Sequence, residues 1–517
     1  MLPQTCRAIA VIEQTKEPGA PGEPLYLDVL ASLTCAAAAG RGQSMPRVVG
    51  GRYGLSSKDF TPAMAKAVFD ELARSESKNG FTIGIDDDVS HTNLAYDPSF
   101  SIESSDTIRA VFYGLGSDGT VGANKNSVKI IAEDAGLHAQ GYFVYDSHKS
   151  GALTISHLRF GPHPIRAPYL IQQANFVACH QFNFVERGDV LRIAAPGAIF
   201  LLNSPHGAEL VWDRLPRSMQ RQIIKKRLRF CVIDASKAAR EVGLRGRTNT
   251  ILQTCFFTLS GVLPRDDAIR QIKESIRKSY ADKGEEVIHR NFRVVDGTLE
   301  RLHEVKVPSE ATSAWDRGPL VPASAPEFVK TITAKMLEGR GDEIPVSLMP
   351  VDGTFPSGTA AYEKRNVAEI VPLWDPDICV QCGQCSLVCP HAVIRAKYYH
   401  ATELKHAPAS FRSAPVNVRG FPDVRFSLQF YIEDCTGCGL CVEICPAYSL
   451  TDPERKAINM VAKLPLVEAE RENIACFGSL PVNDRARVDF ATVCGVHSSN
   501  RSSSFRAPAP AVAKPRI

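Results

Sequence analysis

Two short runs of cysteine constrain the fold of this chain more than any other feature. The first run has cysteines at 379, 382, 385 and 389, directly before Pro390, and the second repeats this spacing at 435, 438, 441 and 445, directly before Pro446. The C-x2-C-x2-C-x3-C-P spacing holds a [4Fe–4S] cluster, and in a protein with two clusters the fourth cysteine of each run binds the other cluster. We therefore expect two ligand groups: Cys379, Cys382, Cys385 and Cys445 for one cluster, and Cys435, Cys438, Cys441 and Cys389 for the other.

Other uses of cysteine explain this pattern less well. Structural zinc sites favour pairs of C-x2-C rather than two triplets that are each followed by Cys-Pro. Disulfides are disfavoured because the sequence shows no secretory signal. The runs therefore predict an α+β bacterial-type 2[4Fe–4S] ferredoxin domain, in which Gly383, Gly437 and Gly439 let the loops turn tightly around the clusters. Of the 15 cysteines, the seven outside the runs have no ligand spacing, and we interpret them as buried or incidental thiols.

Composition narrows the class of protein and of partner. A chain of 517 residues with 44% hydrophobic residues has room for several globular domains. Its net charge of +4 is nearly balanced, which argues against nucleic acid as the main partner. No apolar run approaches the roughly 20 residues that span a bilayer. We therefore expect a cytoplasmic protein without membrane association, in a compartment where thiols stay reduced.

The rest of the sequence divides into segments of different composition. In residues 105–304, candidate strands alternate with helices, which predicts an α/β domain with a largely parallel sheet. Residues 1–90 also show an α/β pattern but have too few elements for a comfortable core. Residues 305–370 are rich in proline and form a small linker module. The segments expected further on are the cluster domain at 371–463 with an insertion at 395–428, an exit segment at 464–493 and a disordered tail at 494–517.

A glycine-rich loop follows the first strand of the 105–304 domain. Gly114, Gly116 and Gly119 have the G-x-G-x-x-G spacing, and Asp146 ends the next strand, where a ribose-binding acid would lie. This pattern fits a nicotinamide-linked reductase, and it also fits a tight turn that binds no ligand. A P-loop is excluded because Lys125 lacks the required spacing from a glycine. The mechanism that the dinucleotide motif and the P-loop share still applies, because glycines and a helix N-terminus offer N–H donors to a phosphate.

Several stretches in a fixed order make the assignment more specific. They are GRYGLSSKDFTPAM, YGLGSDGTVGANKNS, FPSGTAAYEKRNVA with its Glu363-Lys364-Arg365, and the two cysteine runs. Together they resemble pyruvate:ferredoxin (flavodoxin) oxidoreductase of the NifJ type over nearly all of residues 5–492. The resemblance implies that 1–90 is the C-terminal part of a transketolase-C-like α/β domain, that 105–304 is a γ-type α/β domain, and that 305–370 is an EKR linker module.

By resemblance, the glycine-rich loop contacts coenzyme A, a substrate whose diphosphate and 3′-phosphate suit N–H donors and a lysine. The residues that the resemblance assigns to coenzyme A are Ser117, Asp118, Gly119, Thr120, Val121, Lys149, Asn249 and Asn291. Asp118 is unusual beside a phosphate, and we expect its side chain to brace the turn rather than to meet the ligand. The alternative interpretation of Lys149 is an ordinary surface lysine that contacts no ligand.

The resemblance also implies a larger enzyme. In that enzyme thiamine diphosphate and magnesium act on pyruvate, three [4Fe–4S] clusters carry electrons, and a homodimer forms acetyl-CoA. The electron acceptor is ferredoxin or flavodoxin, and Arg395 and Lys397 are candidate docking residues for such an acidic carrier. We find no thiamine diphosphate motif in this sequence, and we assign no catalytic residue.

We therefore expect a truncated central fragment, namely the electron-transfer and coenzyme A-binding portion of such an oxidoreductase. Other chains would supply the thiamine domains, and whether this chain alone is an enzyme stays open. Two alternatives also stay open at this point: a non-functional gene fragment, and an independent 2[4Fe–4S] NAD(P)-linked reductase.

Overall fold

The chain folds into two compact units in a computed structural model. The structure describes residues 2–3, 5–40, 45–54, 58–116, 118–134, 136–145, 153–244, 248–416 and 423–481. The first unit contains residues up to Val144 and Thr154–Ser357, and the second contains the residues from Gly358 onward. The boundary at Ser357 falls inside the expected linker module of residues 305–370. The predicted tail at 494–517 lies outside the described residues.

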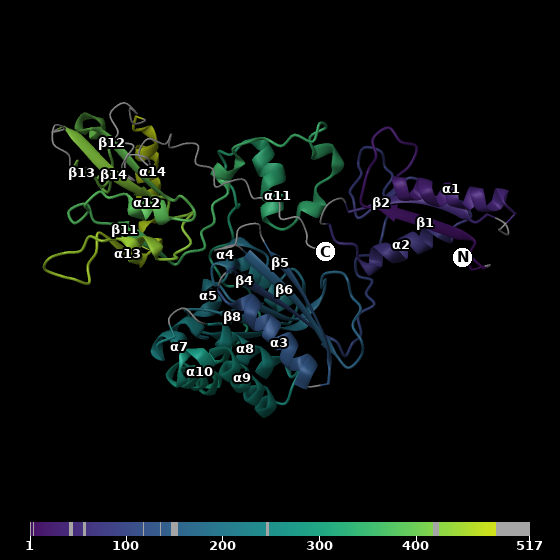
Figure 1. The fold of residues 1–517 in the computed structure, drawn as a ribbon, viewed down its shortest axis with the longest axis horizontal. Helices are drawn as coiled ribbons and strands as arrows, with labels where there is room; N and C mark the ends of the chain where they lie inside the picture. Colours follow the sequence, from purple (N-terminus) through teal and green to yellow (C-terminus); the bar gives the residue numbers. More distant parts are fainter. Residues whose placement is uncertain are drawn as a thin grey trace. The chain divides into compact units, whose positions relative to one another are not determined.

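The first unit begins with a small parallel sheet in the order β1-β2-β3 (Figure 1). Its elements are β1 (Ala8–Glu13), α1 (Pro24–Ala38), β2 (Arg47–Tyr53), α2 (Pro62–Leu72) and β3 (Phe81–Ile83). Helix α2 begins where the sequence favours a start, since Thr61 caps it with a hydrogen bond from the Met64 N–H and Pro62 is its first residue. The core of this part is small, and the fully buried ring of Phe81 lies in it.

A seven-stranded sheet forms the centre of the first unit. Its strands are β4 (Ile108–Leu115), β5 (His138–Tyr145), β6 (Leu153–Gly161), β7 (Ala174–Cys179), β8 (Ala194–Asn203), β9 (Arg229–Ile233) and β10 (His303–Glu304). The order is β10-β9-β8-β7-β4-β6-β5. The pairs β4–β7, β7–β8 and β8–β9 are parallel and only the short β10 is antiparallel to β9 among the pairs described, which confirms the largely parallel sheet.

One expected detail of this sheet is wrong. The sequence favours two strands within VLRIAAPGAIFLLNS, but the structure has the single strand β8 from Ala194. The register between β7 and β8 shifts between Ala174 and Phe176, so that the Pro196-Gly197 step bulges out of the ladder instead of ending the strand. A proline has no N–H to donate, and a bulge is one of the few places where a strand tolerates it.

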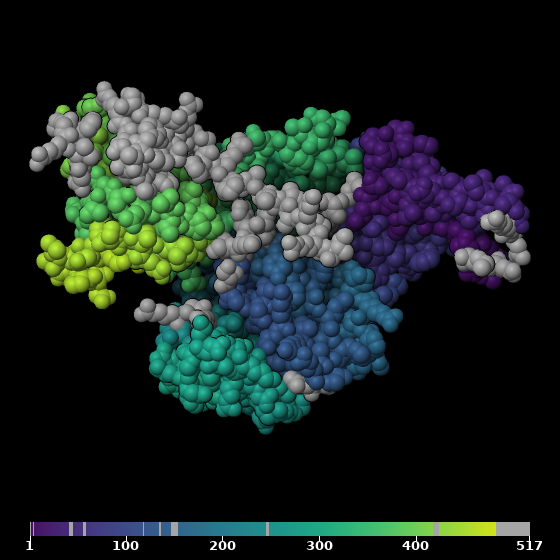
Figure 2. Space-filling model, viewed as in Figure 1, coloured from purple at the N-terminus to yellow at the C-terminus, as the bar shows by residue number. Residues whose placement is uncertain are grey.

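Helices cover both faces of the central sheet (Figures 1 and 2). One core contains residues of α3 (Thr120–Asp134), α7 (Ala235–Glu241), α8 (Asn249–Ser260), α9 (Arg265–Tyr280) and α10 (Glu285–Gly297). In Figure 2 the residues of α9 and α10 belong to the teal surface, next to the blue surface of the earlier residues of this domain. The core on the opposite face contains residues of α4 (Phe184–Arg187), α5 (Val211–Arg214) and α6 (Arg217–Lys225). No helix among the described residues is long and apolar enough to cross a membrane.

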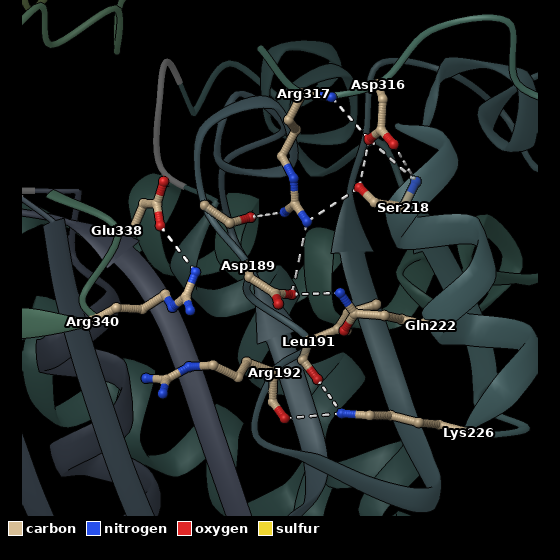
Figure 3. Close-up of polar contacts among 11 residues, drawn as sticks. Asp189, Leu191, Arg192, Ser218, Gln222, Lys226, Asp316, Arg317, Glu338 and Arg340 are labelled. Carbon is tan, nitrogen blue, oxygen red and sulfur yellow. Dashed lines mark hydrogen bonds and ion pairs between the residues drawn. The ribbon is translucent and has the colours of Figure 1, made fainter. Parts of the chain in front are cut away.

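The proline-rich segment after β10 packs on this domain through polar contacts. Arg317 points toward the turn at residues 188–189 and toward Ser218 (Figure 3), and its side chain is only 16% exposed. The expected helix near Glu327–Leu337 is present as a π-helical turn, Val329–Thr333, that continues into α11 (Ala334–Leu337). This segment therefore has its own order although it lacks a sheet of its own in the described residues.

The part of the second unit that the structure describes contains two small antiparallel sheets and three α-helices. Strands β11 (Ile370–Trp374) and β15 (Ile458–Ala462) pair, and β12 (Ile394–His400), β14 (Val424–Phe430) and β13 (Ala414–Pro415) form a second sheet. The helices are α12 (Gln384–Val388), α13 (Leu440–Ile444) and α14 (Val467–Ser479). The expected insertion at 395–428 thus supplies most of the second sheet, and α14 lies within the expected exit segment.

Lys397 corrects one expectation about this unit. We named it as a docking residue for an acidic carrier, but it is only 3% exposed. Its Nζ donates hydrogen bonds to the carbonyl oxygen of Phe477, in the last turn of α14, at 2.8 Å, and to that of Leu480, directly after the helix, at 2.5 Å. The lysine therefore ties β12 to the end of α14, and it is not available to a partner. Arg395 lies over the ring of Tyr431, with its guanidinium carbon 4.3 Å from the ring centroid.

Candidate functional site

The eight cysteines of the two runs gather into two groups in the second unit. Cys379, Cys382, Cys385 and Cys445 line one cavity, together with apolar residues such as Phe426 and Ile458. Cys389, Cys435, Cys438 and Cys441 line another, together with Leu440 and Met460. Each cavity thus combines three cysteines of one run with the last cysteine of the other run, which is the membership that the spacing led us to expect.

The loops of the two runs have the same local form. In the first, the Gln381 N–H donates to Cys379 Sγ at 3.4 Å, and in the second the Gly437 N–H donates to Cys435 Sγ at the same distance. Both donors have a left-handed backbone, with φ of +57° at Gln381 and +70° at Gly437. The sequence interpretation named Gly437 but missed Gln381, because a non-glycine residue gives no signal of a positive φ.

The thiols of both groups are buried, which suits cluster binding better than ionisation in contact with solvent. Burial raises the pKa of Cys435 to about 11 and that of Cys441 to about 12, and it also raises the pKa of Cys385. Thiolate is the form that binds iron, so these buried sulfurs need a cation close by to ionise at neutral pH. Four cysteine sulfurs around an apolar cavity are the donor set of a [4Fe–4S] cluster.

A single metal ion requires several ligand side chains to converge on one point. Within the ranges that the structure describes, no three His, Cys, Asp or Glu side chains meet closely enough to hold one metal ion. A cubane cluster needs no such convergence, because each cysteine binds a different iron at a corner of the cluster.

The glycine-rich loop connects β4 to the N-terminus of α3 in the first unit. The two carboxylate oxygens of Asp118 accept hydrogen bonds from the Leu115 and Thr120 N–H groups, each at 2.8 Å. This confirms that Asp118 braces the turn. Gly119 has a φ of +89°, and a Cβ there would lie 3.1 Å from Cγ of Asn249. Asn249, at the start of α8, is therefore brought next to the loop, as the assignment to coenzyme A requires.

His180 is a residue of this edge that the sequence interpretation did not single out. It directly follows β7, and its Nδ1 lies 2.7 Å from Oγ1 of Thr120 in the first turn of α3. Its Nε2 is buried and has no hydrogen-bond partner in the described part of the chain. Burial lowers the pKa of His180 to about 4, so the ring is neutral at pH 7. The available signal was a histidine at the end of a buried strand, at the sheet edge where parallel α/β proteins bind ligands.

The other assigned residues are less informative. Ser117 and Lys149 lie outside the described residues, as does Asp146 of the nicotinamide alternative. Val121 is half-buried in the first turn of α3. Asn291 is 1% exposed within α10, and its Nδ2 donates to the Val287 carbonyl oxygen at 2.8 Å. Asn249 thus lies beside the loop, whereas the hydrogen bond of Asn291 stays within its own helix.

Comparison with family models matches three consecutive parts of the chain. The pyruvate ferredoxin/flavodoxin oxidoreductase model matches residues 109–300, and a 4Fe-4S dicluster domain matches residues 378–449. Between them, a domain of unknown function named EKR matches residues 314–368. These matches agree with the γ-type α/β domain, the linker module and the two-cluster domain in their predicted order.

Comparison with whole proteins finds longer relatives. A putative pyruvate-flavodoxin oxidoreductase of Synechocystis sp. is 54% identical over 485 residues, which are 94% of this chain and 40% of that protein. The pyruvate:ferredoxin oxidoreductase of Moorella thermoacetica is 46% identical over 510 residues, which are 98% of this chain and 42% of that protein. The chain therefore spans about two fifths of the length of these relatives. Among solved structures, the pyruvate oxidoreductase subunit PORC of Thermotoga maritima is 19% identical, with a TM-score of 0.32, over 39% of this chain and 99% of that subunit.

Proposed function

The chain belongs to the pyruvate ferredoxin/flavodoxin oxidoreductase family, and from this premise we propose that it is the electron-relay and coenzyme A-binding portion of a pyruvate oxidoreductase. One observation carries the proposal. The eight cysteines fall into two cavities whose membership crosses the two runs. A pair of independent metal sites would keep each run to itself, whereas a two-cluster domain exchanges the fourth cysteine.

Each cysteine group would hold one [4Fe–4S] cluster, which accepts and passes on one electron at a time when it is bound. The chain's own residues do the rest. The apolar walls of Phe426, Ile458 and Met460 limit the access of water, and the Gln381 and Gly437 N–H groups donate toward the sulfurs. Limited solvation and N–H donors are the features through which a protein adjusts a cluster's potential.

The loop at Gly114–Thr120 would hold the phosphates of coenzyme A. The first turn of α3, a helix of 15 residues, directs its N–H groups there, and Asp118 fixes the turn by accepting the hydrogen bond of the Thr120 N–H. Asn249 and the neutral His180 lie at the same edge and can add polar contacts. We include Ser117, Thr120, Val121, Lys149 and Asn291 in the proposal on the strength of the family resemblance alone.

The pyruvate chemistry requires thiamine diphosphate and magnesium, for which we assign no residues in this chain. Those groups would belong to other parts of the enzyme, and ferredoxin or flavodoxin would take the electrons, as the names of the relatives indicate. The homodimer expected by resemblance belongs to the proposal for the whole enzyme. The chain alone is then expected to bind clusters and coenzyme A but not to decarboxylate pyruvate.

Anaerobic reconstitution of the full chain tests this proposal. We expect eight irons and eight sulfides per chain, a low-potential EPR signal after reduction, and calorimetric binding of coenzyme A that weakens when the 3′-phosphate is absent. Cys438→Ser should damage the cluster of its own group and spare the cluster on Cys379, Cys382 and Cys385. Four irons or fewer in the wild-type chain would contradict the cluster assignment. Cluster reduction by NADPH would favour a nicotinamide-linked reductase instead.

A further inference from the structure

The glutamate–lysine–arginine segment of the EKR module docks on one of the two cysteine loops. Residues 363–369, here called the EKR segment, run along residues 433–437, the loop that carries Cys435. The Asn366 N–H donates to the Glu433 carbonyl oxygen at 2.7 Å, and Lys364 Nζ lies 3.0 Å from a carboxylate oxygen of Asp434. Asn366 has a φ of +50°. A positive φ costs energy for residues other than glycine, and among these it costs asparagine and aspartate the least.

The loop is held on its other sides as well. The Glu433 carboxylate accepts hydrogen bonds from Arg471 of α14, at 2.8 and 3.3 Å. A Cβ at Gly437 would lie 3.1 Å from the Ile370 carbonyl oxygen and 3.3 Å from Cβ of Ala368. The strand that follows the EKR segment thus closes directly over the turn whose N–H group donates to Cys435 Sγ. The position of that donor depends on the EKR segment.

A buried lysine completes this arrangement. Lys463 is 6% exposed, and its Nζ donates to the Asn366 carbonyl oxygen at 3.2 Å. Its main-chain N–H donates to the Glu369 carbonyl oxygen at 2.9 Å, so both ends of the residue are fixed by the EKR segment. The Lys463 ammonium group is thus joined through Asn366 to Glu433, which lies two residues before Cys435. This places a buried positive charge beside the Cys435 loop.

The other cysteine group has a different environment at the equivalent position. Phe426 lines the cavity of the Cys379 group, and its ring packs against the ring of Trp374, with 5.9 Å between the ring centroids. Trp374 is 1% exposed, so this side of the group is apolar and aromatic. The two groups have the same kind of ligands and the same loop geometry, but within the described residues only the Cys435 loop is joined to a buried cation through the EKR segment.

We propose that the EKR segment and Lys463 raise the reduction potential of the cluster held by Cys389, Cys435, Cys438 and Cys441 above that of the other cluster. This rests on the proposed function, which places a cluster on each group. Reduction adds one negative charge to a cluster, and a fixed cation in a poorly solvated site favours the reduced form. Electrons would then collect on the second group, and the EKR module would have the role of creating this difference.

Lys463→Met in the full chain tests the proposal, with potentiometric titration followed by EPR as the readout. We expect one of the two potentials to fall, so that the cluster is at least tenfold less reduced at a fixed potential, which is about 59 mV for one electron. Lys463→Arg, which keeps the charge, should restore the wild-type value. Lys397→Met is the matched control, because Lys397 is equally buried in the same unit but has its partners at the end of α14. It should leave both potentials unchanged.

Iron content separates this proposal from the one it rests on. Four irons or fewer in the wild-type chain contradicts the proposed function, whereas eight irons with unchanged potentials in Lys463→Met overturns the present inference. If Lys463→Met does not retain both clusters, Lys364→Gln provides the measurement, because the Lys364 side chain is 35% exposed and its loss leaves Asp434 without its cation. A fall in the same potential supports the inference, and an unchanged potential overturns it.

Discussion

The same substitution, glycine to alanine, should have opposite effects at two positions three residues apart. Gly119 has a φ of +89° at the entrance to α3, and a Cβ there would meet Cγ of Asn249 at 3.1 Å. Gly122 lies inside α3, and a Cβ there would have no atom within 4 Å. Position 119 therefore requires glycine because of its positive φ and the nearby Asn249 side chain, and neither reason applies at position 122.

The magnitudes follow from the backbone. An alanine in the left-handed region costs about 1–2 kcal/mol, and the contact with Asn249 adds to this. The lower entropy of the unfolded chain returns about 0.4–1 kcal/mol, so Gly119→Ala should lose about 1 kcal/mol. In a helix interior alanine is better than glycine by about 0.5–1 kcal/mol, so Gly122→Ala should gain close to 1 kcal/mol. The two variants should thus differ by about 2 kcal/mol, which is roughly a 30-fold difference in the opening equilibrium.

Native-state hydrogen exchange of peptides from β4 and α3 is the suitable assay, because it reports the local opening free energy of one part of a chain with several domains. Equal shifts in the same direction would refute the assignment of a positive φ at Gly119. Calorimetry with coenzyme A adds a functional readout, since the methyl group of Gly119→Ala lies against Asn249 at the proposed phosphate contact. Gly122→Ala should bind coenzyme A as the wild-type chain does.

Three further predictions concern the first unit. Burial lowers the pKa of His157 to about 4 from an ordinary value of 6.5. The stability that the neutral ring contributes is therefore complete above pH 6.5, and up to about 3 kcal/mol of it is lost as the pH falls toward 4. Urea unfolding at pH 7 and pH 5 should show this loss, and His157→Asn should make the free energy of unfolding less dependent on pH. Arg317→Met removes hydrogen bonds to the Gly188 carbonyl oxygen and Ser218 Oγ (Figure 3), so the local opening free energy of residues 314–318 should fall by about 1.5–3 kcal/mol in hydrogen exchange. Gly51→Ala drives a Cβ into the fully buried ring of Phe81 and should cost about 1–3 kcal/mol in thermal unfolding, whereas an unchanged midpoint would argue against this packing.

The features that the sequence predicted well are those in which the chemistry is local. The spacing within each cysteine run fixes three ligands on one loop, and the exchange of the fourth follows from the chemistry of two-cluster proteins. Asp118 could be interpreted as a brace because an aspartate in a tight turn bonds to N–H groups two or three residues away. The start of helix α2 is equally local, since Thr61 caps it and Pro62 is its first residue. Each of these interactions is completed within a few residues of the side chain that makes it.

The features that could not be predicted depend on which distant segments meet. His180 lies beside Thr120, which is 60 residues away in the sequence, only because β7 pairs with β4. The residues around His180 carry no signal that predicts the pairing of β7 with β4. The single strand β8 was also missed, because a bulge is defined by its partner strand and not by the Pro-Gly step alone.

Lys397 and Lys463 show most clearly where sequence reasoning stops. Both are lysines within or just after a strand of the second unit, and both would ordinarily be placed on the surface. The structure buries both and gives both of them carbonyl partners, but at Lys397 the partners end α14, and at Lys463 they belong to the EKR segment. One lysine therefore closes a helix against a sheet, while the other brings a positive charge to a cysteine loop. The difference between a structural cation and one that acts on a redox centre lies entirely in the tertiary partner, which is why the paired substitutions Lys397→Met and Lys463→Met distinguish the two roles.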